Sequence, residues 1–445
     1  MSNLDVCYLE RALVFLKKYQ WIFNFRNTDV LTKDVLANLP KDWAEYFNGI
    51  NVDNLHGLVK GNLEDSAPLD FKYLIDEINE LNCKQTCETV ESVESVSYKC
   101  TGLTQKKVHE ITLLAPVINE ICQETKCDLI VDIGSGFGHL PHMLFEKYHY
   151  PVLALEVSNK LIQTALENQT KLKPASKGHV IFKEVFVNKS SAGCIEELVE
   201  ENFGPDKKIC LTGLHACADL SVEVLKLFSR ISKASALVIM PCCYHRMNTD
   251  FKNFPASSLG KKLFDKYQAY GFTGEAFLRL ACQQTSGTFI RMSKEEHEKH
   301  AQQCMHRAVL QLVAEMENCT LRRLKRKSGK SNALDIDVGF QDYLNNLETT
   351  HQLVGRDPNK RIKVTDETFR RKMYEKWTEH KNECWQVEVL MGLQAAIQGI
   401  CENVVLLDRV EFLKEKGIRC YNRKITNDCI SPRCWALIAM KSFPS

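Results

Sequence analysis

The sequence predicts a doubly wound α/β fold, because apolar runs of strand type alternate with helical patterns over residues 129–240. The first run, Leu129–Ile133, has the composition of a strand buried on both faces of a sheet. It leads into Gly134, Gly136 and Gly138, which let the backbone turn sharply and approach a ligand closely. Because 445 residues exceed the size at which one core usually stops growing, a second domain or a large insertion is expected.

The order of the elements follows from the same alternation. We predict strands at 129–133, 152–156, 180–187, 209–214 and 236–240, and helices at 138–148, 158–170, 193–202 and from 219 to about 232. A helical pattern around 386–416 and strands near 418–425 and 434–440 are expected to complete the sheet. An amphipathic segment that starts at Lys106 and is interrupted at Pro116 predicts a helix or a helix pair before the first strand.

Two regions outside this core are expected. Residues 1–98 read as a helical N-terminal region that ends in the polar stretch Cys83–Tyr98, interpreted as a linker or loop. Residues 246–385 form an insertion after the fifth strand that would face the substrate, between core segments 99–245 and 386–445. Aromatic residues of the N-terminal region are predicted to belong to its core: Trp21, Phe23, Phe25, Trp43, Tyr46 and Phe47.

Composition restricts the class of protein. The 58 basic and 56 acidic residues nearly cancel, so the net charge of +2 gives no support to a protein that coats polyanions along its whole surface. The start, MSNLDVCYLE, lacks the basic residues and apolar core of a signal peptide, so the 19 cysteines favour reduced thiols in the cytoplasm or nucleus. No apolar run approaches the length needed to cross a bilayer, and we predict no membrane association.

The spacing of the glycines narrows the type of ligand. A dinucleotide fingerprint requires G-x-G-x-x-G, but the third glycine comes one position early and His139 stands in its place. The D-x-G-x-G-x-G form that begins at Asp132 resembles motif I of class I methyltransferases. Glu156, which ends the second strand twenty residues after Gly136, can accept hydrogen bonds from both ribose hydroxyls of a nucleoside cofactor.

This resemblance implies S-adenosylmethionine (SAM) as the cofactor and a seven-stranded, Rossmann-like class I methyltransferase sheet. Asp132 would order the loop, and Glu156 would hold the ribose hydroxyls. Asn188, after the third strand, is a candidate for the edge of the adenine. The loop residues that would line the methionine and ribose are Gly134, Ser135, Gly136 and Gly138.

Three further motifs narrow the resemblance. The start Lys106-Lys-x-His-Glu110, the segment His215-Ala-Cys-Ala-Asp-Leu220 and the segment Met240-Pro-Cys-Cys-Tyr-His245 resemble the methyltransferase-like 25 family, also called ribosomal RNA adenine dimethylase domain-containing. A related pattern occurs in a family of transfer-RNA ribose methyltransferases, which makes RNA a reasonable substrate class. The tetrad used by adenine amino-methylating enzymes is missing here, and Ala218 stands where the family more often has glycine, which suggests a modest distortion of the turn.

The polar residues after the fourth and fifth strands are the candidates for catalysis, because open α/β sheets bind ligands at the carboxyl ends of their strands. His215, Asp219 or His245 would act as the base that removes a proton from the acceptor, with Asp219 fixing the tautomer of His215. Tyr244 is the aromatic candidate beside them. The alternative for His215 is a structural hydrogen bond to the loop backbone.

Cys217, Cys242, Cys243, His215 and His245 are of the right types for tetrahedral zinc. The adjacent pair Cys242-Cys243 differs from a C-x-x-C knuckle, and neighbouring residues at a strand end tend to point apart, so we predict no metal. A covalent role for Cys242 and simple packing of small polarizable residues beside the cofactor are the other interpretations, and packing is favoured.

The most basic stretch, Leu321–Lys330, has six cations in ten residues and indicates a possible RNA contact over Arg322–Lys330, a nuclear localisation signal or a solvated loop. Aromatic residues beside Arg370, Arg371 and Lys372 favour a helix-face core instead: Phe369, Tyr374 and Trp377. The sequence therefore predicts a SAM-dependent methyltransferase that acts on RNA or a component of the translation machinery. Protein methylation and a non-catalytic SAM-binding scaffold are the alternatives, and no protein partner is identified.

Overall fold

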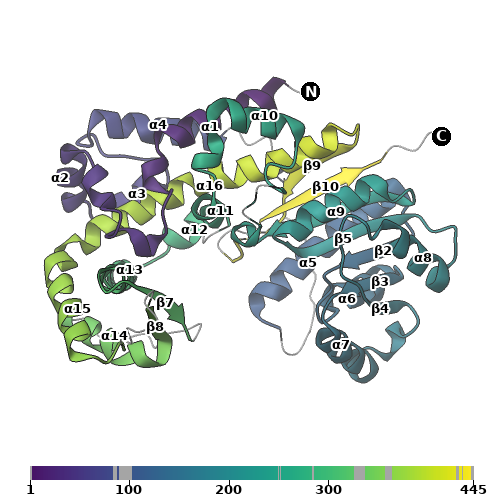
Figure 1. The fold of residues 1–445 in the computed structure, drawn as a ribbon. Helices are drawn as coiled ribbons and strands as arrows, with labels where there is room; N and C mark the ends of the chain where they lie inside the picture. Colours follow the sequence, from purple (N-terminus) through teal and green to yellow (C-terminus); the bar gives the residue numbers. More distant parts are fainter. Residues whose placement is uncertain are drawn as a thin grey trace. The chain divides into compact units, whose positions relative to one another are not determined.

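The computed structural model describes residues 3–83, 88–89, 103–248, 250, 252–282, 285–324, 336–355, 363–426, 430–432 and 434–441 (Figure 1). The chain forms two compact units. Residues 1–17, 81–285 and 399–445 make up the first, called here the sheet unit. Residues 18–80 and 286–398 make up the second, called the helical unit.

The sheet unit is built on one twisted sheet with the strand order β1-β9-β10-β6-β5-β2-β3-β4. Strands β4, β3, β2, β5 and β6 are parallel, whereas β10 runs antiparallel to both β6 and β9. The bounds are β1 Glu88–Thr89, β2 Leu129–Ile133, β3 Val152–Glu156, β4 Val180–Glu184, β5 Ile209–Cys217, β6 Ala234–Cys242, β9 Arg419–Lys424 and β10 Trp435–Met440. The seven strands β2 to β6, β9 and β10 confirm the predicted Rossmann-like sheet, and the two-residue strand β1 adds an eighth at its edge.

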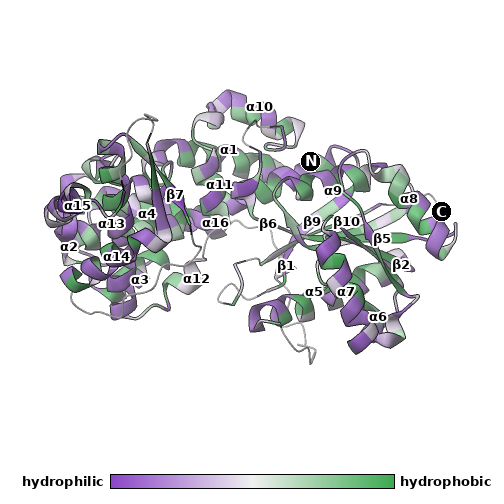
Figure 2. Ribbon diagram, turned by 60° about the horizontal axis from the view of Figure 1, so that its bottom comes forward, coloured by the Kyte–Doolittle hydropathy of each residue, from purple (hydrophilic) through white to green (hydrophobic). Residues whose placement is uncertain are grey.

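Helices cover both faces of this sheet. One apolar cluster joins the strands to α5, α6 and α7, and a second joins their opposite faces to α8, α9 and the end of α16. Figure 2 shows hydrophobic and hydrophilic residues side by side along these helices, as expected where one face packs on a sheet. The helices are α5 Gln105–Thr125, α6 His139–Tyr148, α7 Asn159–Leu172, α8 Ala192–Phe203, α9 Asp219–Arg230 and α16 Cys384–Lys414, with α1 Asn3–Lys18, α10 Ser258–Tyr267 and α11 Glu275–Ala281 elsewhere in the unit.

Pro116 does not interrupt the helix before the first strand, contrary to the expectation. α5 is one helix of 21 residues that continues through Pro116. Leu114 and Val117, on either side of the proline, are buried in the core cluster against the sheet. Burial of this apolar face outweighs the missing backbone hydrogen bond, which by itself disfavours proline inside a helix.

The strand ends differ from the predictions in ways that affect the site. β4 ends at Glu184, three residues earlier than expected, so Asn188 lies in the following turn. β5 extends to Cys217 and β6 to Cys242, each beyond its predicted end. The added length of β5 follows a β-bulge, because the register shifts between Gly213 and Ala216 while the pairing with β6 continues.

The linker expected at Cys83–Tyr98 contains one short strand. Glu88 and Thr89 form β1, which pairs in parallel with Arg423 and Lys424 of β9. The rest of that stretch, apart from Cys83 at the end of α4 Leu69–Cys83, lies outside the described residues. Backbone pairing at a sheet edge needs no apolar side chains, which explains why the polar composition did not indicate a strand.

The helical unit combines N-terminal helices with most of the sequence after residue 285. Four of the six predicted N-terminal aromatic residues are buried, namely Phe23, Phe25, Trp43 and Phe47. Phe369 and Trp377 are buried as expected, whereas Tyr374 is partly exposed. The elements are α2 Lys41–Gly49, α3 Val52–Val59, α4, α12 Ser286–Phe289, α13 Lys294–Met316, α14 Ile336–Thr350, α15 Glu367–His380 and the antiparallel pair β7 Cys319–Arg323 and β8 His351–Gly355.

The boundaries of the units differ from the expected ones. Residues 18–80 pack with 286–398 in one unit, so the N-terminal region is not a separate domain that ends at residue 98. Residues 258–282, expected within the insertion, belong to the sheet unit. Part of the basic stretch is strand rather than loop, since Arg322 and Arg323 lie on β7, and residues 325–330 lie outside the described part of the chain.

One helical run is apolar enough to cross a bilayer by length and composition. Glu367–Lys414 contains an 18-residue window of mean hydropathy 1.5, so the expectation that no run is long enough is wrong for this segment. However, 94% of that window is buried inside the protein. Such burial is typical of a core helix, because a packed core and a bilayer select the same apolar residues.

Candidate functional site

The glycine loop follows β2 and leads into α6. Gly134, Gly136 and Gly138 all have positive φ angles, of 76°, 57° and 78°. A Cβ atom at Gly138 would lie 2.5 Å from Phe182 Cζ, so only glycine fits there. A Cβ atom at Gly136 would meet no atom within 4 Å, so this backbone borders open space. The loop therefore combines one tightly packed glycine with one whose backbone has open space beside it.

Glu156 at the end of β3 faces this loop. Its Oε2 accepts a hydrogen bond of 3.0 Å from the backbone N–H of Gly136, and its Oε1 accepts bonds from the N–H groups of Val157 and Ser158. The side chain is only 8% exposed. The structure thus brings together the loop and the carboxylate that the sequence separates by twenty residues.

Asp132 lies at the penultimate position of β2 and is buried. Burial, followed by the nearby Glu156 carboxylate, raises the pKa of Asp132 from its ordinary value near 4 to about 7. Within the described residues, Asp132 Oδ1 and Ser135 Oγ are buried side-chain atoms without a hydrogen-bond partner. Two unsatisfied polar atoms beside an open loop fit a site that is completed by a ligand.

Apolar side chains at the same edge were missed by the sequence reasoning. The register pairs Glu156 with Glu184, so Val157 and Phe186 follow neighbouring strand ends. Val157 is 56% exposed and Phe186 is 73% exposed. Exposed apolar groups at adjacent strand ends suit a flat ring such as adenine. Their position just beyond two strand ends is the signal that would have found them.

Asn188, the predicted contact to adenine, is engaged in its own turn. Its Oδ1 accepts hydrogen bonds from the N–H and the hydroxyl of Ser190. Its backbone N–H donates to Ser191 Oγ, just before α8. This arrangement is typical of an asparagine that stabilises a turn, and it leaves the predicted role without direct support.

The loop, the acid and the apolar edge fit SAM in three respects. The backbone around Gly136 is open, the Glu156 carboxylate lies at a neighbouring strand end, and exposed apolar side chains lie beyond both β3 and β4. Glu156 would hold the ribose hydroxyls, the loop would hold the methionine end, and Val157 and Phe186 would cover the adenine. When bound, SAM supplies an electrophilic methyl group on a sulfonium.

His215 lies in the bulged part of β5, next to β2. Its Nε2 is 3.6 Å from Glu110 Oε2, and Glu110 is fully buried on α5. The other oxygen of Glu110 accepts a hydrogen bond of 2.6 Å from Ser431 Oγ. The carboxylate beside His215, the predicted base, is therefore that of Glu110. In the sequence, Glu110 belongs to the Lys106–Glu110 motif, which indicated a family resemblance but no role in the site.

Asp219 does not have the predicted role of fixing the tautomer of His215. It is the first residue of α9, and its carboxylate oxygens accept hydrogen bonds from the backbone N–H of Asn248 and the side chain of Asn253. The carboxylate near His215 is that of Glu110. The sequence suggested Asp219 because it is close in number, whereas the neighbour in space comes from another helix.

Tyr244 is buried and is therefore misplaced as a residue that meets the acceptor. Its side chain is 1% exposed, and the guanidinium of the buried Arg409 lies over its ring at 4.8 Å. Its hydroxyl donates a long hydrogen bond of 3.4 Å to the carbonyl of Pro241. Burial raises the pKa of Tyr244. Its position fits a role in the core beneath the turn.

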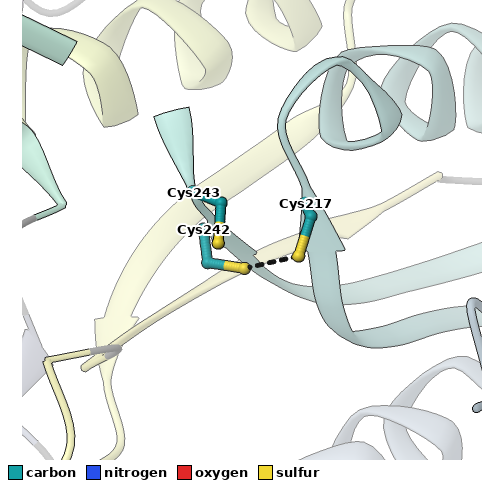
Figure 3. Close-up of side chains that lie close together, drawn as sticks. All are labelled: Cys217, Cys242 and Cys243. Atoms are coloured by element: carbon teal, nitrogen blue, oxygen red, sulfur yellow. Dashed lines mark hydrogen bonds between the residues drawn. The ribbon is translucent and has the colours of Figure 1, made fainter. Parts of the chain in front are cut away.

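Thiols gather where β5 and β6 end. The Sγ atoms of Cys217 and Cys242 are 3.1 Å apart, and Cys243 follows directly (Figure 3). His245 Nδ1 lies 3.1 Å from Cys282 Sγ, in the same part of the sheet unit. Burial lowers the pKa of His245, which favours a neutral imidazole. The sequence indicated Cys217, Cys242, Cys243 and His245 as residues of the right types for zinc. It did not indicate Cys282.

A basic hollow of about 840 Å³ lies elsewhere on the sheet unit. Five cationic side chains line it, and no carboxylate does. Lys226 also pairs with Glu223, which stands outside the lining. The lining residues are Lys189, Lys226, Ser229, Arg230, Phe412, Lys416, Gly417, Ile418 and Lys441.

The helical unit contains a separate polar cluster that the sequence reasoning did not single out. The fully buried carboxylate of Glu388 lies 2.6 Å from His297 Nδ1 and 2.7 Å from His300 Nδ1. His297 Nε2 lies 3.0 Å from His56 Nε2. The pair at i and i+3 on α13 was the available signal, and the arrangement links α3, α13 and α16 within this unit.

Fold and strand-end geometry together define a Rossmann-like methyltransferase domain. Residues 106–250 match the family model described as "Methyltransferase domain". The chain is similar to the Probable methyltransferase-like protein 25 of Homo sapiens, with 26% identity over 247 residues. The protein of the same name from Mus musculus is 24% identical over 246 residues. The resemblance inferred from the motifs is thereby confirmed.

These matches cover part of each protein. Both span 53% of this chain and 38% of the length of the relative. The family match begins at the start of α5 and ends shortly after β6, so it includes the glycine loop, Glu156 and the thiols. The similarity therefore concerns the methyltransferase domain and not the whole of either protein.

Proposed function

We propose that this chain is a SAM-dependent methyltransferase that acts on RNA or on a component of the translation machinery. The main support for SAM as the cofactor is the contact between the open backbone of Gly136 and the buried carboxylate of Glu156. In place of this bond, Glu156 would accept hydrogen bonds from the ribose hydroxyls of a nucleoside cofactor. The methyltransferase domain match supports the same reaction class.

The protein's contribution to methyl transfer is mainly positioning and removal of a proton. An in-line displacement requires the acceptor to lie on the far side of the methyl group from the sulfur. His215 extends from a bulge in β5, the strand next to β2, and is the residue we propose as the base. Glu110 would stabilise the imidazolium that forms when His215 takes the proton.

RNA is favoured as the acceptor by the charge of the basic hollow. Five cations without a lining carboxylate suit a polyanion, because each phosphate contact releases condensed counterions. Such contacts position a nucleic acid without reading its sequence. The basic residues Arg322 and Arg323 of β7 are a second set of cations that this proposal includes.

The compartment proposed for this reaction is the cytoplasm or the nucleus. None of the 15 cysteines whose side chains the structure describes forms a disulfide bond. Reduced thiols in this number suit a reducing compartment.

The cofactor is tested by titrating SAM into the full chain in a calorimeter. Glu156→Gln should weaken binding at least about tenfold, since a hydrogen bond to a charged group contributes about 1.5–3 kcal/mol. Asp128→Asn is the matched control, because Asp128 also accepts a backbone N–H, that of Lys208, but stands before β2 at the opposite edge of the sheet. No binding by the folded wild-type chain would overturn the proposal.

A second pair of variants distinguishes the loss of a contact between the loop and SAM from a general effect of backbone strain. Gly136→Ala and Gly178→Ala both introduce a Cβ at positive φ, and neither Cβ meets an atom within 4 Å. Only Gly136→Ala should weaken SAM binding. Equal losses in both variants would show that strain, rather than the cofactor contact, is being measured.

The acceptor is tested with radiolabelled SAM and cell extracts treated with ribonuclease or protease. Labelling that ribonuclease removes and protease leaves supports RNA, and the reverse result supports a protein acceptor. The charge reversals Lys189→Glu and Lys416→Glu should weaken RNA binding and reduce its salt dependence. Lys261→Glu and Lys262→Glu on α10 give the same charge change outside the hollow. SAM binding without any labelled product would identify a non-catalytic scaffold.

A further inference from the structure

Three thiols converge at the carboxyl ends of two neighbouring strands. The register of β5 and β6 pairs Cys217 directly with Cys242. The Sγ atoms of Cys217, Cys242 and Cys243 all lie within 4.8 Å of one another. Figure 3 shows the sulfurs of Cys217 and Cys242 facing each other, with that of Cys243 beside them.

The backbone explains how two consecutive cysteines reach the same space. In a continuing strand their side chains would point to opposite faces. Cys243 instead has φ 54° and ψ 40°, a left-handed conformation in which the strand ends and the chain turns. A non-glycine residue seldom adopts these angles. The turn removes the objection that adjacent cysteines at a strand end point apart.

The spacing of the sulfurs suits one metal ion. Zinc binds thiolates at about 2.3 Å, so two sulfurs of a tetrahedral site are about 3.8 Å apart. The observed spread of the three Sγ atoms, from 3.1 Å to at most 4.8 Å, brackets that value. A disulfide would need a sulfur separation of about 2 Å. Small shifts of the side chains would therefore place an ion among the three sulfurs.

A compensating charge is present nearby. Three thiolates and one divalent cation carry a net charge of −1, which is costly to bury without a partner. Arg409 is fully buried, and its guanidinium lies over the ring of Tyr244 in the turn that follows Cys243. It also donates to Ser221 Oγ, on the helix that follows Cys217. This cation thus contacts the turn after Cys243 and the helix after Cys217, and it interacts electrostatically with Cys242 as well as with the carboxylates of Asp219 and Asp408.

We propose that Cys217, Cys242 and Cys243 bind one zinc ion, with the fourth coordination position open to the side of His245 and Cys282. The open position is what distinguishes a reactive zinc site from a closed structural one. Because β5 lies next to β2, this ion would sit on the acceptor side of the cofactor loop. The inference does not rest on the proposed function, since metal can bind whether or not methyl transfer occurs.

The metal content of the full chain tests this proposal. The protein is purified with a reductant, loaded with zinc sulfate, dialysed and analysed by plasma mass spectrometry. About one tightly held zinc per chain is expected for the wild type. The single variants Cys217→Ser, Cys242→Ser and Cys243→Ser should each lose most of it. Cys210→Ser is the control, because Cys210 is buried on the same strand β5 but outside the cluster.

Alkylation of the wild-type chain keeps the test independent of how the variants fold. Iodoacetamide followed by peptide mass spectrometry should find Cys217 and Cys243, which are only partly buried, protected in the loaded protein and modified after chelation. Exposed Cys7 and Cys194 should be modified in both samples. Cobalt loading should add the near-ultraviolet charge-transfer band of thiolate ligands. A wild-type chain that retains no zinc, or zinc retained in the triple serine variant, would overturn the proposal, as would a Cys217–Cys242 disulfide.

Discussion

The ligand-binding edge of the sheet has a cofactor half, at the ends of β2 and β3, and an acceptor half, at the ends of β5 and β6. The residues that contact one another are close in sequence in the cofactor half and far apart in sequence in the acceptor half. At the ends of β2 and β3, Gly136 and Glu156 contact each other directly, and the supporting residues lie within 132–186. At the ends of β5 and β6, His215 depends on Glu110 and Ser431, and the turn at Tyr244 depends on Arg409. The first half is thus built by one continuous β-α-β-α-β segment, and the second by contacts across most of the sheet unit.

This difference has a consequence for variants. A substitution in the cofactor half changes the loop itself, so its effect can be estimated from local backbone angles and nearby atoms. A substitution in the acceptor half releases partners on α5, α9 or α16. We therefore expect the largest losses of stability in the acceptor half, and the most specific losses of SAM binding in the cofactor half.

The largest expected effect is at Tyr244. Tyr244→Ala should lower the free energy of unfolding by about 3–5 kcal/mol, because it removes a fully buried ring and leaves a cavity beneath Arg409. Tyr244→Phe should cost only about 0.5–1.5 kcal/mol, since it removes one long hydrogen bond. Urea unfolding measures both variants. If Tyr244→Phe folds normally but loses methyl transfer, the hydroxyl is catalytic and the structural role is wrong.

Gly138→Ala tests the cofactor half in the same way. The new Cβ would lie 2.5 Å from Phe182 Cζ at φ 78°, so we expect a loss of about 2–4 kcal/mol from strain and overpacking. Gly178→Ala, at φ 85° with open space around the Cβ, should lose only about 1–2 kcal/mol. The difference between the two urea midpoints isolates the contact with Phe182. Equal losses would contradict the packing described for the loop.

Asp132 predicts a pH dependence of stability. Burial, followed by Glu156, raises its pKa to about 7, above the value near 4 of the unfolded chain. Between these values the folded state holds a proton that the unfolded state has lost, so stability falls as pH rises, by up to about 1.4 kcal/mol per unit. Asp132→Asn should remove this fall.

Unfolding free energies of the wild type and Asp132→Asn at several values between pH 4 and 7 give the comparison. Burial lowers the pKa of His142 to about 4, which makes stability rise with pH over part of this range. That contribution is common to both proteins and cancels in their difference. Parallel curves for the two proteins would exclude a raised pKa at Asp132.

The smallest effect is expected at Ala218, in the turn between β5 and α9. Its φ of 52° and ψ of −130° lie in a region that favours glycine, so the strain is larger than the modest distortion expected from the sequence. Ala218→Gly should raise the free energy of unfolding by about 1 kcal/mol. Thermal melting measures the gain. A lower melting temperature would indicate that the flexibility of glycine in the unfolded chain outweighs the relieved strain.

The cofactor half of the site can be predicted from the sequence to a greater extent than the acceptor half. The sequence predicts the loop and Glu156 because one short motif and one strand end contain them. It does not predict the contact between Glu110 and His215, because the two residues lie 105 positions apart. It does not predict that Cys242 and Cys243 converge, because Cys243 adopts left-handed angles that are usual only for residues such as glycine and asparagine.

The sequence by itself determined the alternating α/β core, the succession of its strands along the chain, and the glycine loop with Glu156. These features depend on hydrophobic periodicity and on glycine backbone freedom, which act over a few residues. Only the tertiary structure decided the division into units, the burial of Tyr244, the partner of His215 and the thiol cluster. Each of these depends on contacts between segments far apart in the chain, where burial and packing rather than local preference set the position of a side chain.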